Sequence, residues 1–202
     1  MNTRKIRLAI MASGKGSNAE AIIKFSREKE AAFQVVLIIT NNPEAGVIDV
    51  AKRHSTNWEC INAKGYVNKE DAEIKLLESI EKNGVEMIAL AGYLQLIPQK
   101  LIDKFPDRIL NIHPSLLPKY GGKGMYGLRV HKKVIENREQ ISGSSVHIVE
   151  SEYDSGKILC QSLVTIDENE MPITLSEKVL QVEHTIYPLV LNEQSKQIIS
   201  GL

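Results

Sequence analysis

The chain has 202 residues, and its 25 basic (Lys, Arg) and 25 acidic (Asp, Glu) residues give a formal net charge of zero. Hydrophobic residues make up 43%, which is typical of a globular chain that buries one large core. Zero net charge and an aromatic content of 5% argue against a nucleic-acid partner held by bulk positive charge or by base stacking. The length predicts a single large domain.

The cysteine content and the apolar segments bear on the compartment. Cys60 and Cys160 form no C-x-x-C motif, and we expect free thiols in a reducing compartment, with one disulfide as the alternative. The apolar run at 8–12 is about five residues long, whereas an export signal needs roughly 7–15. No stretch approaches the ~18 apolar residues of a membrane span. The sequence therefore predicts a cytoplasmic protein without a membrane partner.

Short apolar runs alternate with longer amphipathic segments along the chain. The expected strands are 6–12, 33–40, 58–61, 85–91, 108–112, 144–150 and 157–166. The expected helices are 17–29, 47–54, 68–82, 98–104, 128–137 and 175–191. This alternation predicts a mostly parallel twisted sheet with helices on both faces, and the two late strands predict an antiparallel edge. We therefore expect a three-layer α/β domain with ligands at the carboxyl ends of the strands.

A glycine turn, residues 14–18, joins the first strand to the first helix. It fits the dinucleotide pattern G-x-G-x-x-G/A, but the second strand ends at 40–43 (Thr-Asn-Asn-Pro) without the acidic residue that would hold a ribose. An NAD-dependent oxidoreductase is therefore the weaker alternative. Free backbone N–H groups of Gly16, Ser17 and Asn18 at a helix N-terminus predict a phosphate site. The alternative is an ordinary tight turn capped by Ser17.

The segment 108–114 ends a predicted strand with Asn111 and His113 two residues apart. Residues two apart share one face of a strand, and Pro114 favours an extended backbone before it. An amide and an imidazole then stand side by side, where they can stabilise an oxyanion and move a proton. The alternative is a packed histidine beside a structural asparagine.

An acidic turn, residues 150–156, joins the last two strands. Such a turn is usually solvated, but Asp154 precedes Ser-Gly and can be held inward. A carboxylate near His113 would raise the pKa of the imidazole by favouring its charged form.

The remaining histidines carry weaker signals, and His131 is expected in an exposed helix. No pair of histidines has the spacing of a metal site, so we predict no metal. The histidines in question are His54, His131, His147 and His184.

Several segments together resemble the phosphoribosylglycinamide formyltransferase family, folate-dependent enzymes of purine synthesis. The segments are 14–18, 90–93, 110–120, 145–147, 154–156 and 183–188, and the resemblance covers nearly the whole chain. It implies one formyltransferase-fold domain over 1–202, with a Rossmann-like phosphate-binding half at 1–100 and a catalytic, folate-binding half at 101–202. It also implies that the amine of glycinamide ribonucleotide attacks the formyl carbon of 10-formyltetrahydrofolate. The expected partners are these small molecules, in a monomer or homodimer.

The resemblance also implies a role for individual residues. The residues expected to be catalytic are Asn111, His113 and Asp154. The residues expected to bind the ribonucleotide are Gly16, Ser17, Asn18 and Glu183. The residues expected to bind the folate are Lys69, Leu94, Gln95, Leu96, Ile97 and, again, Asn111.

Three features depart from the family pattern. Gln95 stands where many members carry Arg, and Leu180 replaces a polar residue one turn before Glu183. The 119–127 loop contains four glycines and is longer than in familiar members, which suits a lid over the folate. Two alternatives remain open: a folate-dependent formyltransferase that acts on another amine, and a non-catalytic phosphate-binding module.

Overall fold

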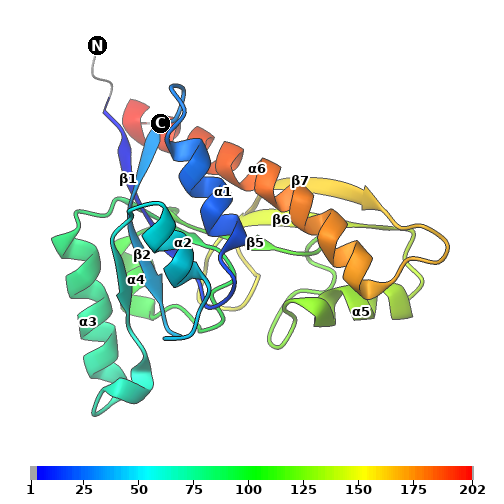
Figure 1. Cartoon of the computed structure of the whole chain (residues 1–202), viewed down its shortest axis with the longest axis horizontal. Helices are drawn as coiled ribbons and strands as arrows, with labels where there is room; N and C mark the ends of the chain where they lie inside the picture. The colour runs from blue at the N-terminus through cyan, green and yellow to red at the C-terminus, as the bar shows by residue number, and fades with distance from the viewer. Residues whose placement is uncertain (1–3, 202) are drawn as a thin grey trace.

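Seven strands form one sheet in the order β3-β2-β1-β4-β5-β6-β7 (Figure 1). The computed structural model describes residues 4–201. The strands are β1 (Ile6–Met11), β2 (Phe33–Thr40), β3 (Trp58–Cys60), β4 (Met87–Leu90), β5 (Ile109–His113), β6 (Ile141–Ile148) and β7 (Ile158–Thr165). The pairs from β3 to β5 are parallel, whereas β6 and β7 pair antiparallel. The predicted parallel sheet with an antiparallel edge is confirmed.

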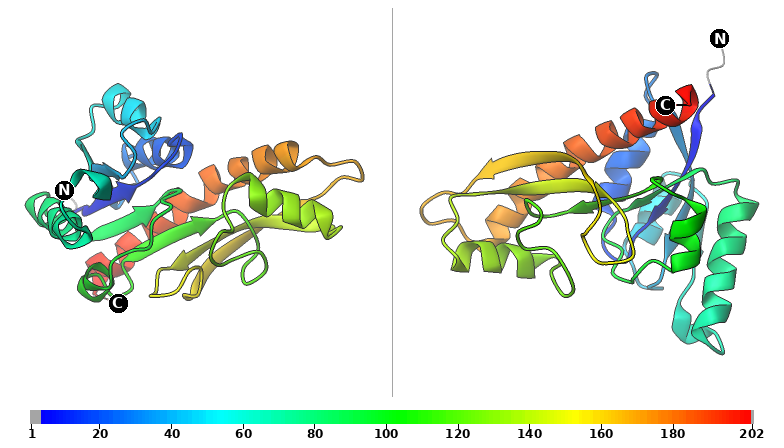
Figure 2. Two further views of the ribbon diagram at one scale, coloured as in Figure 1. Left: turned by 90° about the horizontal axis from the view of Figure 1, so that it is seen from below. Right: turned by 180° about the vertical axis from the view of Figure 1, so that it is seen from behind.

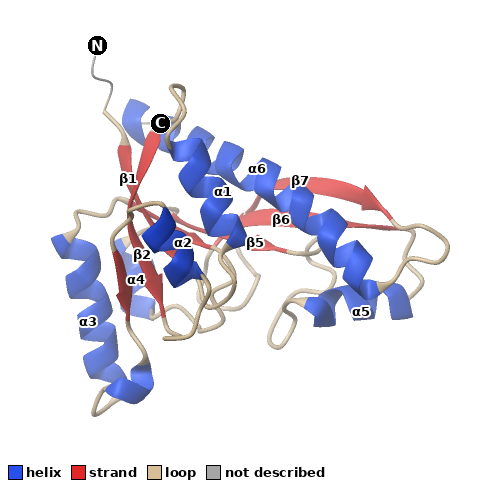
Figure 3. Ribbon diagram, in the orientation of Figure 1, coloured by secondary structure: helices blue, strands red, loops and turns tan. Residues whose placement is uncertain are grey.

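Helices cover both faces of this sheet (Figure 2). They are α1 (Ser17–Ser26), α2 (Val47–Arg53), α3 (Lys69–Lys82), α4 (Gln99–Lys104), α5 (Leu128–Glu136) and α6 (Pro172–Ser200), with a 3-10 turn at Ala63–Gly65. One core cluster joins the sheet to α1, α2 and α6, and a second joins the opposite face to α3 and α4. The three-layer architecture is therefore confirmed (Figure 3).

Strand β1 shows why the sequence folds into three layers. Leu8 and Ile10 belong to the cluster under α1 and α6, whereas Ala9 and Met11 belong to the cluster under α3. Successive strand residues point to opposite faces, so a continuous apolar run buries both faces of a central strand.

Helix α6 contacts two central strands near the carboxyl end of β4. The hydroxyl oxygen of Tyr187 lies 3.0 Å from the carbonyl oxygen of Leu90 in β4 and 2.8 Å from that of Leu110 in β5. Tyr187 is fully buried, so these contacts satisfy a hydroxyl that burial would otherwise leave unpaired. The site described below lies at the carboxyl ends of β4 and β5.

Several element boundaries differ from the prediction by two or three residues, and the end of the last helix differs most. The last helix continues from Leu191 to Ser200 because Leu191 and Ser195 are still buried against the core, and it ends at Gly201, whose φ of 74° is left-handed. Strand β6 begins at Ile141, three residues before the predicted start, because it pairs with β7 along its whole length.

The two cysteines are free thiols, as expected. Cys60 lies on β3 and Cys160 on β7, which are opposite edges of the sheet. The disulfide alternative is therefore wrong. Among the helices of residues 4–201, none is long and apolar enough to cross a membrane.

Candidate active site

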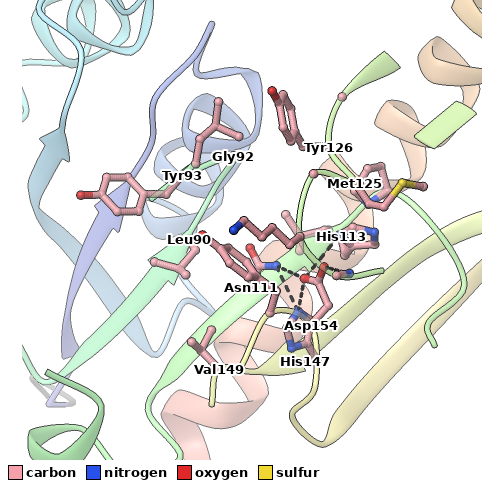
Figure 4. A pocket seen from close by; sticks show the side chains of 18 of the residues that line it. Leu90, Gly92, Tyr93, Asn111, His113, Met125, Tyr126, His147, Val149 and Asp154 are labelled. Atoms are coloured by element: carbon pink, nitrogen blue, oxygen red, sulfur yellow. Dashed lines mark hydrogen bonds and ion pairs between the residues drawn. The ribbon is translucent and has the colours of Figure 1, made fainter. Parts of the chain in front are cut away.

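A cavity of about 660 Å³ opens at the carboxyl ends of β1, β4 and β5 (Figure 4). Its walls come from the glycine turn, the segment after β4, the end of β5, the 119–127 loop, the acidic turn and helices α5 and α6. This volume is within the range of small-molecule sites.

The glycine turn depends on Gly16. Its φ is 84°, and a Cβ at this position would lie 2.7 Å from the Cα of Val47, so no other residue fits without displacement. Gly16 is also the N-cap of α1 and supplies no side chain to the free N–H groups of the first turn. These donors stay available for an anion.

Asn41, which directly follows β2, holds the residue that precedes the glycine turn. Asn41 Oδ1 accepts a hydrogen bond of 2.6 Å from Ser13 Oγ, and Ser13 Oγ accepts one of 3.0 Å from the backbone N–H of Leu94. At the end of β2, where a dinucleotide site would carry an acidic residue, this chain has the amide of Asn41, which binds Ser13 beside the glycine turn.

His113 ends β5 and is 4% exposed. Its Nε2 lies 2.8 Å from the carbonyl oxygen of Tyr120. Because a carbonyl only accepts, Nε2 carries the proton, and Nδ1 is the nitrogen left to titrate. Nδ1 lies 3.5 Å from Asp154 Oδ1.

Asp154 is held inward, as the sequence suggested. Its φ of 55° is left-handed, a conformation that aspartate tolerates better than most residues. Its Oδ2 accepts a hydrogen bond of 2.8 Å from the backbone N–H of Gly122, and its Oδ1 lies 3.5 Å from Asn111 Nδ2. Burial alone would raise the pKa of Asp154, but His147, His113 and the Gly122 N–H together hold it below its ordinary value. Asp154 is therefore ionised at neutral pH.

Asp154 raises the pKa of His113, as expected, but the net pKa lies below its ordinary value. Burial lowers the pKa of His113, and this effect exceeds the increase caused by the charge of Asp154 and the hydrogen bond to Tyr120. The free imidazole is therefore neutral at neutral pH, with Nδ1 available as a base.

His147 belongs to this cluster, although its sequence signal was weak. It stands directly opposite Asn111 in the β5–β6 pairing. Its Nδ1 donates to the carbonyl oxygen of Ile148 at 2.8 Å, and its Nε2 lies 3.0 Å from Asn111 Nδ2. The same Nε2 lies 3.5 Å from Asp154 Oδ1. The alternation of residues along strand 144–150 could have indicated that His147 faces the site. That inference required knowing which strand β6 pairs with.

Asn18 and Glu183 form another pair at the cavity wall. Asn18 Nδ2 donates a hydrogen bond of 2.7 Å to Glu183 Oε2. Burial raises the pKa of Glu183 to about 7, against a lowering by the Asn18 hydrogen bond. The carboxyl group is therefore about half ionised at neutral pH.

The expected folate residues divide into two groups. Lys69 is not among the cavity-lining residues; it lies at the start of α3 and pairs with Glu73 at 3.4 Å. The segment after β4 does line the cavity, at Leu94, Gln95, Leu96 and Ile97. Of the glycine turn, Gly14 and Asn18 line the cavity, whereas the predicted phosphate-binding residues Gly16 and Ser17 are not among the lining residues.

His131 is buried, contrary to expectation. Helix α5 packs on α6, and His131 is 2% exposed and lines the cavity. In the part of the chain that the structure describes, no group of three or more His, Cys, Asp or Glu residues is arranged to hold a metal ion.

Comparisons with known proteins agree with this geometry. A sequence profile described as "Formyl transferase" matches residues 6–191. The chain is 34% identical over 187 residues to the phosphoribosylglycinamide formyltransferase of Bacillus subtilis, with 93% of each chain covered. Among solved structures, the phosphoribosylglycinamide formyltransferase of Bacillus halodurans is similar, with a TM-score of 0.86, 34% identity and coverage of 95% of this chain and 96% of that one.

Some relatives are longer than this chain. It is 40% identical over 185 residues to the chloroplastic phosphoribosylglycinamide formyltransferase of Arabidopsis thaliana, with 91% of this chain covered, but it spans 63% of that protein. It spans 18% of a human protein named trifunctional purine biosynthetic protein adenosine-3, at 31% identity and 93% of this chain. The profile match and the full-length bacterial relative show that the chain belongs to the formyl transferase family.

Proposed function

We propose that this chain transfers the formyl group of 10-formyltetrahydrofolate to the primary amine of glycinamide ribonucleotide, a step of purine synthesis, in the cytoplasm. One observation carries the proposal: Asn111, His113 and Asp154 meet in a cavity whose wall includes the glycine turn. The similarity to proteins named phosphoribosylglycinamide formyltransferase supports the choice of amine. In this proposal the chain is one domain, with the phosphate-binding half at 1–100 and the catalytic half at 101–202.

In the proposal, the folate lies between the segment after β4 and the acidic turn. Leu94 and Leu96 are half exposed in the cavity, where they offer apolar surface to a pterin ring, and Ile97 is buried behind them. Val149 and Tyr153 line the facing wall. Lys69 pairs with Glu73 and does not line the cavity, and its role in folate binding stays a prediction.

The ribonucleotide occupies the other end of the cavity. Its phosphate accepts hydrogen bonds from the backbone N–H groups of Gly16, Ser17 and Asn18, and its ribose hydroxyls donate to Glu183. A phosphate dianion at the N-terminus of α1 is also favoured by the helix dipole.

The reaction moves one proton. The amine nitrogen attacks the formyl carbon, a C–N bond forms, and the carbonyl electron pair moves onto the oxygen, where Asn111 Nδ2 stabilises the charge. His113 Nδ1 takes the proton of the amine, and Asp154 stabilises the imidazolium. The intermediate collapses, the bond to N10 of the folate breaks, and the imidazolium donates its proton to N10.

We expect Glu183 to give ribonucleotide binding a pH dependence. The pKa of Glu183 is about 7, so the carboxylate that accepts the ribose hydroxyls is scarce at pH 6 and abundant at pH 8. Glu183→Gln has no such ionisation. The KM of Glu183→Gln for the ribonucleotide, divided by the KM of wild type, should therefore rise from pH 6 to pH 8. Steady-state assays at fixed folate concentration measure this ratio. A ratio that does not vary with pH would remove Glu183 from ribose binding.

The decisive experiment is a formyl-transfer assay. The protein is mixed with 10-formyltetrahydrofolate and glycinamide ribonucleotide, and tetrahydrofolate release is followed with and without the amine. Release that depends on the ribonucleotide is the expected result. Equal release with another amine, such as a sugar nucleotide, would assign a different acceptor, and binding without release would favour a phosphate-binding module. We expect no nucleic-acid or membrane partner, in a monomer or homodimer.

A further inference from the structure

The N-terminus of α5 opens into the same cavity as the glycine turn. Gly127 and Arg129 line the cavity. Gly127 is the N-cap, supplies no side-chain hydrogen bond, and is followed by a first turn without an acidic residue. The N-terminus of this nine-residue helix therefore borders the cavity, and no carboxylate caps the backbone N–H groups of Leu128 and Arg129.

A buried nitrogen without a partner lies beside this helix end. His131 is 2% exposed and lines the cavity, and among residues 4–201 its Nδ1 has no hydrogen-bond partner. Burial lowers the pKa of His131 to about 4, so the ring is neutral and carries one N–H. A buried polar atom without a partner costs free energy unless a ligand or water satisfies it.

Two cations line the cavity near this helix end. Within residues 4–201, Lys123 and Arg129 form no ion pair with a carboxylate, whereas their neighbours Lys119 and Lys133 each pair at 2.9 Å. The guanidinium of Arg129 lies 5.0 Å from the ring centre of Tyr126, which also lines the cavity. This contact orients the cation without neutralising it.

The packing of α5 against α6 favours an anion at the end of the cavity that also carries Glu183. Helix α5 packs on α6, where Val130 and Val134 contact Leu175 and Val179. The same α6 carries Glu183, whose bond to Asn18 leads to the glycine turn.

Glu150 and Glu152 of the acidic turn also line the cavity, and their charges disfavour a bound anion beside that turn. One turn before Glu183, α6 presents the apolar Leu180 to the cavity.

We propose that the N-terminus of α5, with Arg129 and Lys123, forms an anion subsite that binds the phosphate of the ribonucleotide from the side opposite the glycine turn. The proposal rests on the proposed function for the identity of the phosphate ester. It adds two specificity-determining cations from the 119–127 loop and α5 to the backbone donors of α1.

Direct binding measurements test this subsite. The titrants are ribose 5-phosphate and, separately, folic acid, each added to wild type, Arg129→Met, Lys123→Met and Lys132→Met in a calorimeter at fixed ionic strength. Lys132 is an exposed cation on α5 that does not line the cavity, so Lys132→Met removes the same charge elsewhere. All three side chains are exposed, and circular dichroism checks that each variant is folded.

We expect Arg129→Met to raise the Kd of ribose 5-phosphate about tenfold or more, because a charge-assisted hydrogen bond contributes on that order. Lys123→Met should raise it less, because its side chain is not oriented by an aromatic ring. Lys132→Met should leave it unchanged, and the Kd of folic acid should not change in any variant.

Several results would overturn the subsite. Ribose 5-phosphate could bind Arg129→Met as tightly as wild type, lose equal affinity in Lys132→Met, or fail to bind wild type. A loss of affinity confined to folic acid would instead assign the two cations to the folate tail. None of these measurements requires formyl transfer. A protein that loses phosphate affinity in Arg129→Met but never releases tetrahydrofolate would keep the subsite and refute the proposed function alone.

Discussion

Replacing His113 with alanine should lower kcat by on the order of 10²–10⁴, because the proton can no longer pass from the amine to N10 through one positioned imidazole. The ring lies 3.5 Å from Asp154 and 2.8 Å from the Tyr120 carbonyl oxygen, and no other cavity histidine shares both contacts. Steady-state kinetics with both substrates measures the change. KM for the ribonucleotide should change little, because His113 acts on the reacting atoms rather than on the phosphate.

His54→Ala is the matched control for this variant. His54 lies 3.2 Å from Glu20, and it does not line the cavity. The control should keep the wild-type kcat. If His113→Ala stayed within a few-fold of wild type, the proton-transfer role of His113 would be refuted.

The second large effect is expected for Asp154→Asn. The amide keeps the size of the side chain but removes the charge that stabilises the imidazolium, and we expect kcat to fall on the order of 10²-fold. Burial already holds the pKa of His113 below its ordinary value, and Asp154 acts in the opposite direction. Removing the charge should therefore lower the pKa of His113 further.

The pH–rate profile separates this role from a merely structural one. In the proposed mechanism activity requires neutral His113, so we expect activity to fall as the pH drops through the pKa of His113. In Asp154→Asn this acidic limb should move to lower pH. A slow variant with the limb of wild type would mean that Asp154 shapes the loop without acting on the imidazole. Glu152→Gln is a useful control because Glu152 lines the cavity in the same turn but contacts neither His113 nor Asn111 in any hydrogen bond or ion pair of the described chain.

The sheet and the central pair of the site were predictable from local patterns. Continuous β-branched runs such as 33–40 identify strands buried on both faces, and the two-residue period places Asn111 and His113 on one side of β5. The start of α3 follows a local pattern as well, because Asn68 Oδ1 caps the helix by accepting a hydrogen bond of 2.8 Å from the Asp71 N–H.

The features that were missed depend on tertiary structure. His147 joins the site because β6 pairs antiparallel with β5, and no local pattern gives that register. His131 lies on a short helix whose burial depends on packing against α6. The pKa of His113 is a balance between burial and a nearby carboxylate, and only coordinates give its sign.

The pairing of Asn111 with His147 has a further consequence for how this family can change. The two side chains are brought together by backbone hydrogen bonds in the middle of a sheet, and not by the connection that runs between their strands. Residues 114–140 can therefore lengthen, shorten or exchange side chains without separating the amide from its imidazole. Such changes are limited by the backbone of Tyr120 and Gly122, which holds His113 and Asp154 in place.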